Sequence, residues 1–109
     1  MARKNKRTTV RFPVYSNYLM VVIESSDVAR TARRLGVELD NCAAGCIWRA
    51  DSPMRVWIIF ERRAKESTIA HEASHAVRSM FREVGVRCDD ETFAYHLGHL
   101  VGRLHKFLK

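Results

Sequence analysis

The segment of residues 67–84 constrains the fold most strongly, because its apolar side chains recur at spacings of three and four. This spacing predicts one amphipathic helix, with Ser67 as its N-cap and Gly85 as its C-terminal stop. The segment also holds an H-E-x-x-H sequence that runs from His71 to His75. Two histidines four residues apart lie on one face of a helix, one turn from each other. The sequence therefore predicts that both imidazoles reach one metal ion.

The other elements predict a small sheet followed by a second long helix. β-Prone apolar runs indicate strands at residues 10–14, 19–24, 46–50 and 55–60, with a short helix between Asp27 and Gly36. A last helix opens at Asp89, Asp90 and Glu91 and carries an apolar stripe to Leu108. This order predicts an α+β domain, in which a sheet of about four strands with a short helix precedes two long packed helices. We expect all the helices, including the short one, on one face of the sheet. Residues 55–60 are nevertheless apolar on both sides, so this strand should be at least partly covered on both.

Positive charge is concentrated at the N-terminus. The chain has 109 residues, which fits one domain, and a net charge of +7. Five basic residues precede the first acidic residue, Glu24, whereas residues 12–109 carry a net charge of only +2. We therefore expect residues 1–11 to form a flexible basic tail and residues 12–109 to form a single domain. Such a tail is most often a solvated terminus, and less often an arm that binds nucleic acid.

Cysteine usage and hydropathy point to a reducing compartment. The chain has three cysteines, Cys42, Cys46 and Cys88, and an odd number argues against a disulfide framework. Free thiols in a reducing cytoplasm are the simplest interpretation. The longest purely apolar run, residues 19–23, is far too short to cross a bilayer. We therefore expect a cytoplasmic protein with no membrane partner.

A metal site of this kind needs a third ligand, because catalytic zinc usually has three protein ligands and a water. Glu91 is the best candidate, since it begins the last helix and the turn after Gly85 lets that helix fold back along the first. Ala94, Gly98 and Gly102 form a row of small residues one turn apart. Glycine is costly inside a helix, so the row predicts that the two helices approach closely beside the metal.

Other polar side chains of the last helix are weaker candidates. Tyr95 follows Glu91 by one turn and is a candidate donor to a developing oxyanion. The alternative for Tyr95 is a tyrosine that only packs between the helices. His96, His99 and His105 fit surface or core positions better than metal ligation.

This arrangement resembles the gluzincin metallopeptidases, in which H-E-x-x-H is followed by a glutamate helix of the form E-x-x-A. Here Glu91-Thr92-Phe93-Ala94 follows the histidine pair, and the small size and the order of elements are similar to the minimal gluzincins. Residues 12–15, residues 67–72 and the later pattern from Glu91 to Gly98 also resemble small metallopeptidases encoded by bacteriophages. The resemblance implies a metallopeptidase-like domain over residues 12–109 that acts in the cytoplasm of the host cell.

The expected chemistry is hydrolysis of peptide bonds. His71, His75 and Glu91 would hold Zn²⁺, which lowers the pKa of a bound water. Glu72 would accept a proton from that water and pass it to the leaving amine. The peptide or protein substrate would lie along residues 55–60 as an added strand.

Two alternatives from other functional classes fit the same sequence. The first is a non-catalytic protein with a structural zinc that binds nucleic acid through its basic tail, so that binding falls steeply with salt. The second is a small interaction protein, such as a phage-encoded inhibitor of a host factor. That protein would still bind its partner after replacement of Glu72.

Overall fold

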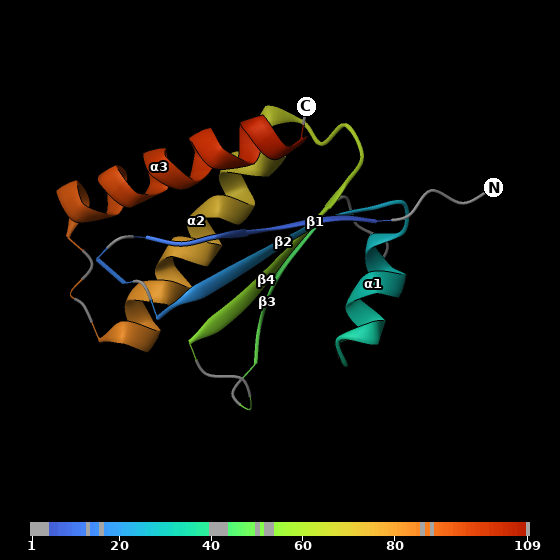
Figure 1. Ribbon diagram of the computed structural model, residues 1–109, viewed down its shortest axis with the longest axis horizontal. Helices are drawn as coiled ribbons and strands as arrows, with labels where there is room; N and C mark the ends of the chain where they lie inside the picture. Colours follow the sequence, from blue (N-terminus) through green and yellow to red (C-terminus); the bar gives the residue numbers. More distant parts are fainter. Residues whose placement is uncertain are drawn as a thin grey trace.

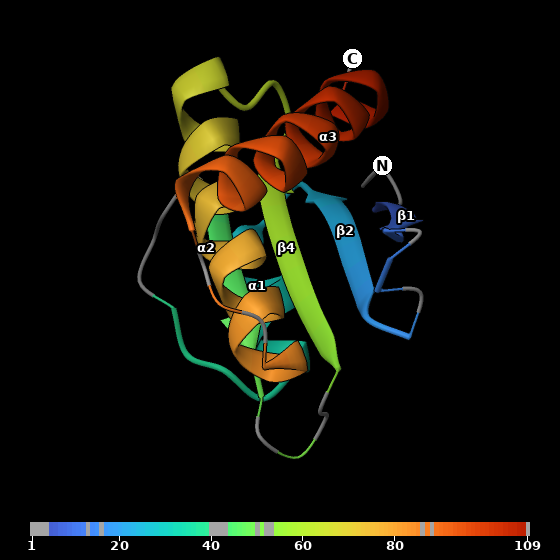
Figure 2. The same ribbon diagram turned by 90° about the vertical axis from the view of Figure 1, so that its left-hand side faces the viewer.

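A four-stranded sheet with helices on both faces forms the described part of the chain in the computed structural model. The described residues are 5–12, 14–15, 17–39, 44–49, 51, 54–85, 87 and 89–108. Along the chain the elements are β1 (Lys6–Val10), β2 (Leu19–Ser25), α1 (Val28–Arg34), β3 (Ala44–Trp48), β4 (Arg55–Glu61), α2 (Glu66–Val84) and α3 (Asp90–Leu108). Figure 1 and Figure 2 show α1 on one side of the sheet and α2 and α3 on the other. The predicted α+β architecture, with two long packed helices at the end, is confirmed.

The sheet has the strand order β1-β2-β4-β3. Its two inner strands, β2 and β4, pair in parallel, with Val22 opposite Ile58, and each outer strand is antiparallel to its inner neighbour. Five consecutive residues of β4, from Val56 to Phe60, are buried. Strands that are covered on both faces read as continuous apolar runs, which explains the runs in β2 and β4.

Two hydrophobic cores lie on opposite faces of the sheet. The larger one joins α2 and α3 to side chains such as Met20, Val22 and Ile58, and the smaller one joins α1 to Val21 and Ile59. The prediction that helices cover one face only is therefore wrong, whereas the expected cover on both sides of β4 is confirmed. Alternate residues of β2 serve the two cores, because successive side chains of a strand point to opposite faces.

Helix boundaries follow the predicted capping residues with one exception. Asp27 caps α1 by accepting a hydrogen bond from the Arg30 backbone N–H, and Gly85 ends α2 in the left-handed region at φ 73°. Ser67 is not the N-cap of α2; that position falls to Lys65, whose side chain makes no capping hydrogen bond. At the start of α3, Asp89 Oδ1 accepts a hydrogen bond of 2.8 Å from the Thr92 backbone N–H.

Two sequence boundaries move in the structure. The first strand occupies Lys6–Val10 and not residues 10–14, so part of the expected basic tail is an outer strand of the sheet. Lys6 Nζ also lies 3.5 Å from Glu24 Oε1 on the neighbouring strand. The third strand begins at Ala44, two residues before its predicted start. In the described part of the chain, neither α2 nor α3 is both long enough and apolar enough to cross a membrane.

The row of small residues on α3 faces away from α2. Gly98 and Gly102 are exposed, and a Cβ atom built at either position meets no heavy atom within 4 Å. The buried side of α3 is formed instead by His96, Leu100 and Leu104. The predicted close approach of the two helices through the small residues is therefore wrong, because larger apolar side chains at neighbouring positions take up the interface.

Replacing Gly98 or Gly102 by alanine is expected to stabilise the protein, since each position has room for a methyl group and alanine favours a helix. Each change should add about 0.5–1 kcal/mol to the free energy of unfolding, measured by urea denaturation. Gly85→Ala is the matched control and should lower that free energy, because Gly85 has a positive φ. A loss of stability in both helix variants would mean that this face of α3 is covered.

Candidate metal centre

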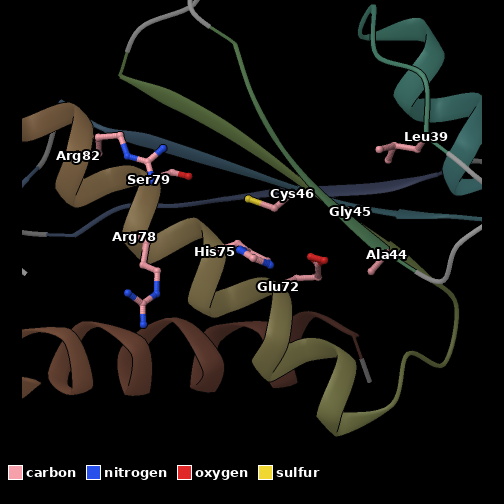
Figure 3. Close-up of a pocket in the computed structure, with 9 residues that line it drawn as sticks. All are labelled: Leu39, Ala44, Gly45, Cys46, Glu72, His75, Arg78, Ser79 and Arg82. Carbon is pink, nitrogen blue, oxygen red and sulfur yellow. The ribbon is translucent and has the colours of Figure 1, made fainter.

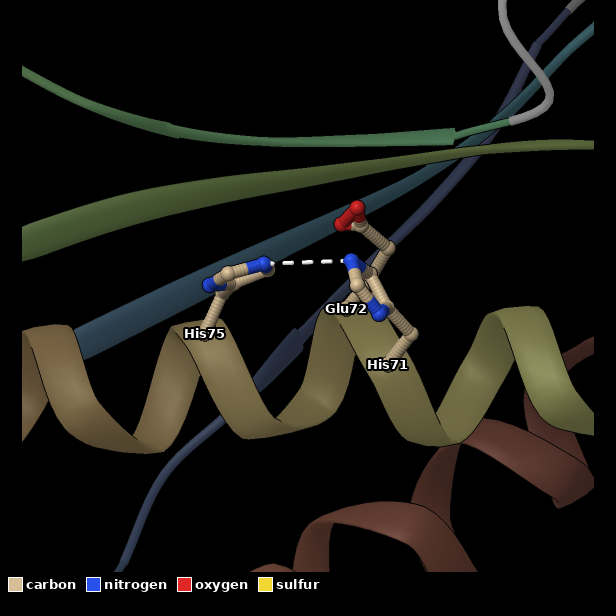
Figure 4. A group of neighbouring side chains, drawn as sticks. All are labelled: His71, Glu72 and His75. Atoms are coloured by element: carbon tan, nitrogen blue, oxygen red, sulfur yellow. Dashed lines mark hydrogen bonds between the residues drawn. The ribbon is translucent and has the colours of Figure 1, made fainter.

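Three polar side chains of α2 come together beside the edge of the sheet. The ligand atoms of His71, Glu72 and His75 all lie within 4.8 Å of one another. Figure 4 shows them on the side of α2 that faces β3 and β4, with the two imidazoles one helical turn apart. The predicted pairing of His71 with His75 on one helix face is confirmed by this geometry.

The distance between the imidazoles suits a shared ion. His71 Nε2 and His75 Nε2 are 3.2 Å apart, with ring centroids 4.7 Å apart. Two nitrogens that bind one tetrahedral zinc at about 2.0–2.1 Å lie about 3.3 Å from each other. A hydrogen bond between a donating and an accepting neutral imidazole has a similar length. The separation therefore fits a metal ion without distortion of the helix.

Glu72 differs from the histidines in its surroundings. His71 and His75 are exposed, whereas Glu72 is only 8% exposed and turns toward the sheet. Its Oε2 atom is buried and has no hydrogen-bond partner among the described residues. A buried polar atom without a partner is destabilising and is uncommon in folded proteins. An atom of this kind beside two imidazoles fits the chemistry of a metal site, in which a water or a cation would satisfy it.

A groove runs between α2 and the outer strand β3. One hollow, of about 460 Å³, is lined at the start of α2 by Ser67, Thr68 and His71. A second, of about 400 Å³, continues along the helix past His75. Figure 3 shows nine residues that line the second hollow, including Cys46 above His75 and Glu72. Because Glu72 lines both hollows, the three-residue cluster stands at the middle of the groove.

Two weakly acidic groups, one in β3 and one directly before β2, are held neutral near this groove. Burial, together with the Glu72 carboxylate, raises the pKa of the Cys46 thiol to about 12. Burial, followed by the charges of Cys46 and Glu83, also raises the pKa of the Tyr18 hydroxyl above its ordinary value. Tyr18 is fully buried, and its hydroxyl has no hydrogen-bond partner among the described residues. Cys46 is therefore a neutral thiol in the groove at physiological pH, and only a metal or another strong perturbation would ionise it.

Glu91 does not join the histidine pair. It is exposed in the first turn of α3 and lies outside the group formed by His71, Glu72 and His75. The start of α3 packs against the last turns of α2, as shown by Arg78 over the Phe93 ring at 4.7 Å. The turn after Gly85 is short, so α3 has covered too little of its return path at Glu91 to reach His75. The predicted ligand role of Glu91 therefore has no support from this geometry.

Tyr95 also lies away from the cluster. Its side chain is 76% exposed and forms an edge-on contact with His96, with ring centroids 5.6 Å apart. Tyr95, His96 and His99 line a separate hollow with Phe12 and Val14. The predicted oxyanion role of Tyr95 is therefore not supported. His96 is a buried histidine whose Nδ1 donates a hydrogen bond to the Thr92 carbonyl oxygen.

The expected position of a bound peptide needs correction. Residues 55–60 belong to β4, which is hydrogen-bonded to β2 on one side and β3 on the other. A strand with two partners has no free edge for a peptide. Sequence reasoning missed that β3 is the outer strand beside the cluster and that Cys46 faces it, because strand order is not readable from the order of elements. Cys42 and Cys88 lie outside the described residues.

Comparison with protein-family models, curated proteins and solved structures finds no match for this chain. The resemblance to the gluzincins therefore stays a prediction from the motif. The site has to be judged by the arrangement of its own side chains.

Metal content is expected to depend on the two histidines and not on Glu91. The purified protein, loaded with Zn²⁺ and dialysed without chelator, should hold about one ion per chain in elemental analysis. His71→Ala and His75→Ala should each abolish this, because the loss of one of the two imidazole ligands removes most of the affinity. Glu91→Ala is the matched control and should keep the ion. Loss of the ion in Glu91→Ala alone would contradict the placement of α3.

Proposed function

We propose that this protein is a zinc-dependent peptidase that acts on extended polypeptide segments. The observation that carries the proposal is the buried Glu72 Oε2, which has no hydrogen-bond partner among the described residues. It lies beside two imidazole nitrogens that are 3.2 Å apart, at the middle of a groove. His71 and His75 would hold the ion through Nε2. The donor set of two imidazoles and a neighbouring carboxylate suits zinc.

In the proposed reaction the metal ion and the protein have separate roles. Bound zinc would polarise a water and the carbonyl group of the peptide. Glu72 is the general base of the proposal, since its carboxylate lies within reach of the position between the two imidazoles. The same side chain would then return the proton to the leaving amine. Burial of Glu72 on the sheet side keeps its carboxylate directed to one place.

The groove also offers a place for the peptide. β3 is the outer strand of the sheet on this side and runs alongside α2, with Ala44 near His71 and Cys46 near His75. An extended peptide can add to such an edge through backbone hydrogen bonds. We therefore place the substrate along β3, in a protein of the cytoplasm where a free thiol such as Cys46 persists.

Replacement of Glu72 by glutamine is the sharpest test of the proposed catalysis. Glu72→Gln preserves side-chain volume but removes the base, so cleavage of an unstructured protein such as casein should fall by at least about 100-fold. Mass spectrometry of the fragments measures the rate. The zinc content of the variant should equal that of the unaltered protein. Equal cleavage by both proteins would exclude Glu72 as the base.

A second candidate is a zinc-binding protein that does not hydrolyse peptides. It is favoured by the absence, among the described residues, of a third ligand beside the cluster other than Glu72 itself. In that case Glu72 would be a metal ligand. Glu72→Gln would then lose zinc along with the histidine variants, which separates the two candidates in a single measurement.

A further inference from the structure

We propose that the end of the groove beyond His75 recognises a carboxylate of the substrate through Arg82, so that the preferred peptides carry an acidic group on one side of the cleaved bond. This inference rests on the proposed peptidase function and adds a substrate class to it. The carboxylate is either an acidic side chain or the free C-terminus of the peptide.

The two ends of the groove differ in charge. Hydroxyl groups of Ser67 and Thr68 line the end at the start of α2, whereas Arg78 and Arg82 line the other end. Glu72 is the only acidic residue among the described residues that line either hollow. The groove is therefore neutral on one side of the cluster and cationic on the other.

The two arginines are not equivalent. Arg78 is directed toward α3 in Figure 3, and its guanidinium lies 4.7 Å from the centre of the Phe93 ring. Arg82 extends toward Ser79 in the same view. Within the described part of the chain Arg82 forms no hydrogen bond or ion pair. The guanidinium of Arg82 therefore has its donors free for a ligand and, unlike that of Arg78, is not held over an aromatic ring.

The neighbouring acid does not neutralise Arg82. Glu83 accepts a hydrogen bond from the Trp48 indole N–H, which ties its carboxylate to β3. A guanidinium offers paired donors that match the two oxygens of a carboxylate. An anionic group in the groove would thus meet an unpaired cation with suitable geometry.

The position of Arg82 fixes where the acidic group should stand. Arg82 is seven residues after His75 on the same face of α2, which corresponds to about 10 Å along the helix axis. An extended peptide covers about 3.3 Å per residue. Because β3 runs alongside α2, a peptide added to it would place a carboxylate near Arg82 about two to three residues from the cleaved bond.

The first arm of the test maps cleavage. The zinc-loaded protein is incubated with a synthetic mixture of unstructured peptides, and mass spectrometry identifies the bonds that are cut. We expect Asp and Glu to be enriched by about fivefold at one position, two or three residues from the bond. Arg82→Gln should remove the enrichment, and Arg82→Glu should replace it with enrichment of Lys and Arg. Arg103→Gln, on the exposed face of α3, is the charge-matched control and should leave it unchanged.

The second arm measures binding without cleavage. Fluorescent decapeptides with a single Glu or Gln at successive positions, and with a free or amidated C-terminus, are titrated into zinc-loaded Glu72→Gln protein and followed by anisotropy. Tighter binding of the Glu peptides, lost in the double variant with Arg82→Gln, supports recognition of a side chain. A preference for the free C-terminus, lost in the same variant, supports recognition of that carboxylate.

The outcomes separate this inference from the function on which it rests. Cleavage without any acidic preference, or a preference that survives Arg82→Gln, overturns the role of Arg82 and leaves the peptidase proposal in place. Arg82-dependent binding without cleavage overturns the peptidase proposal and retains the carboxylate site. Neither cleavage nor binding of any peptide overturns both.

Discussion

The packing of α2 against β4 is the constraint on which the candidate site depends. The helix buries Ile69, Ala73, Ala76, Val77 and Met80, and the strand contributes Val56, Ile58 and Phe60 to the same core. Successive side chains of a helix are rotated by about 100° about the helix axis. The packing of the apolar residues therefore also fixes the directions of the side chains between them. Glu72 precedes the buried Ala73 and points toward the border of the sheet, while His71 and His75 remain at the outer rim. Rotation by one residue would bury a histidine or expose the carboxylate.

Much of this architecture could be predicted from local patterns. The β-prone run at residues 19–24, the cap at Asp27 and the stop at Gly85 each depend on residues close in sequence, and each appears as expected. The histidine pair belongs to the same class, because its geometry is set by a single helical turn. By contrast, the order of the strands depends on long-range pairing that no local pattern records. The sequence therefore predicts a peptide added along β4, whereas β3 is the outer strand that lines the groove.

The position of Glu91 outside the histidine cluster has a reason of geometry and not of chemistry. Glu91 is suitable as a ligand, but the turn between α2 and α3 is short, and two antiparallel helices joined in this way bring their adjoining ends together. Contacts of Phe93 with Arg78 and of His96 with Phe81 show this pairing of ends. The prediction that the small-residue row packs against α2 is wrong for a similar reason. The spacing shows that these residues share one face of α3, but it does not show which face of α3 contacts α2. In α3 the larger apolar residues Leu100 and Leu104 decide the interface, since their burial removes more apolar surface from water.

The burial of Glu72 connects stability with the proposed function. A carboxylate oxygen without a hydrogen bond is a cost to the folded state, and an apolar residue at this position would remove it. The neighbouring Cys46 thiol has a pKa raised to about 12, so it stays neutral and adds no second negative charge beside the Glu72 carboxylate. Among the described residues, the exposed imidazoles of His71 and His75 lie within 4.8 Å of the carboxylate and could compensate it through a water or an ion held between them. A local arrangement that costs stability is characteristic of a functional site. The faces of α2 thus have different roles. Its apolar residues pack against the sheet, and Glu72 lies at the edge of that interface. The exposed residues between His71 and Arg82 are accessible to a ligand.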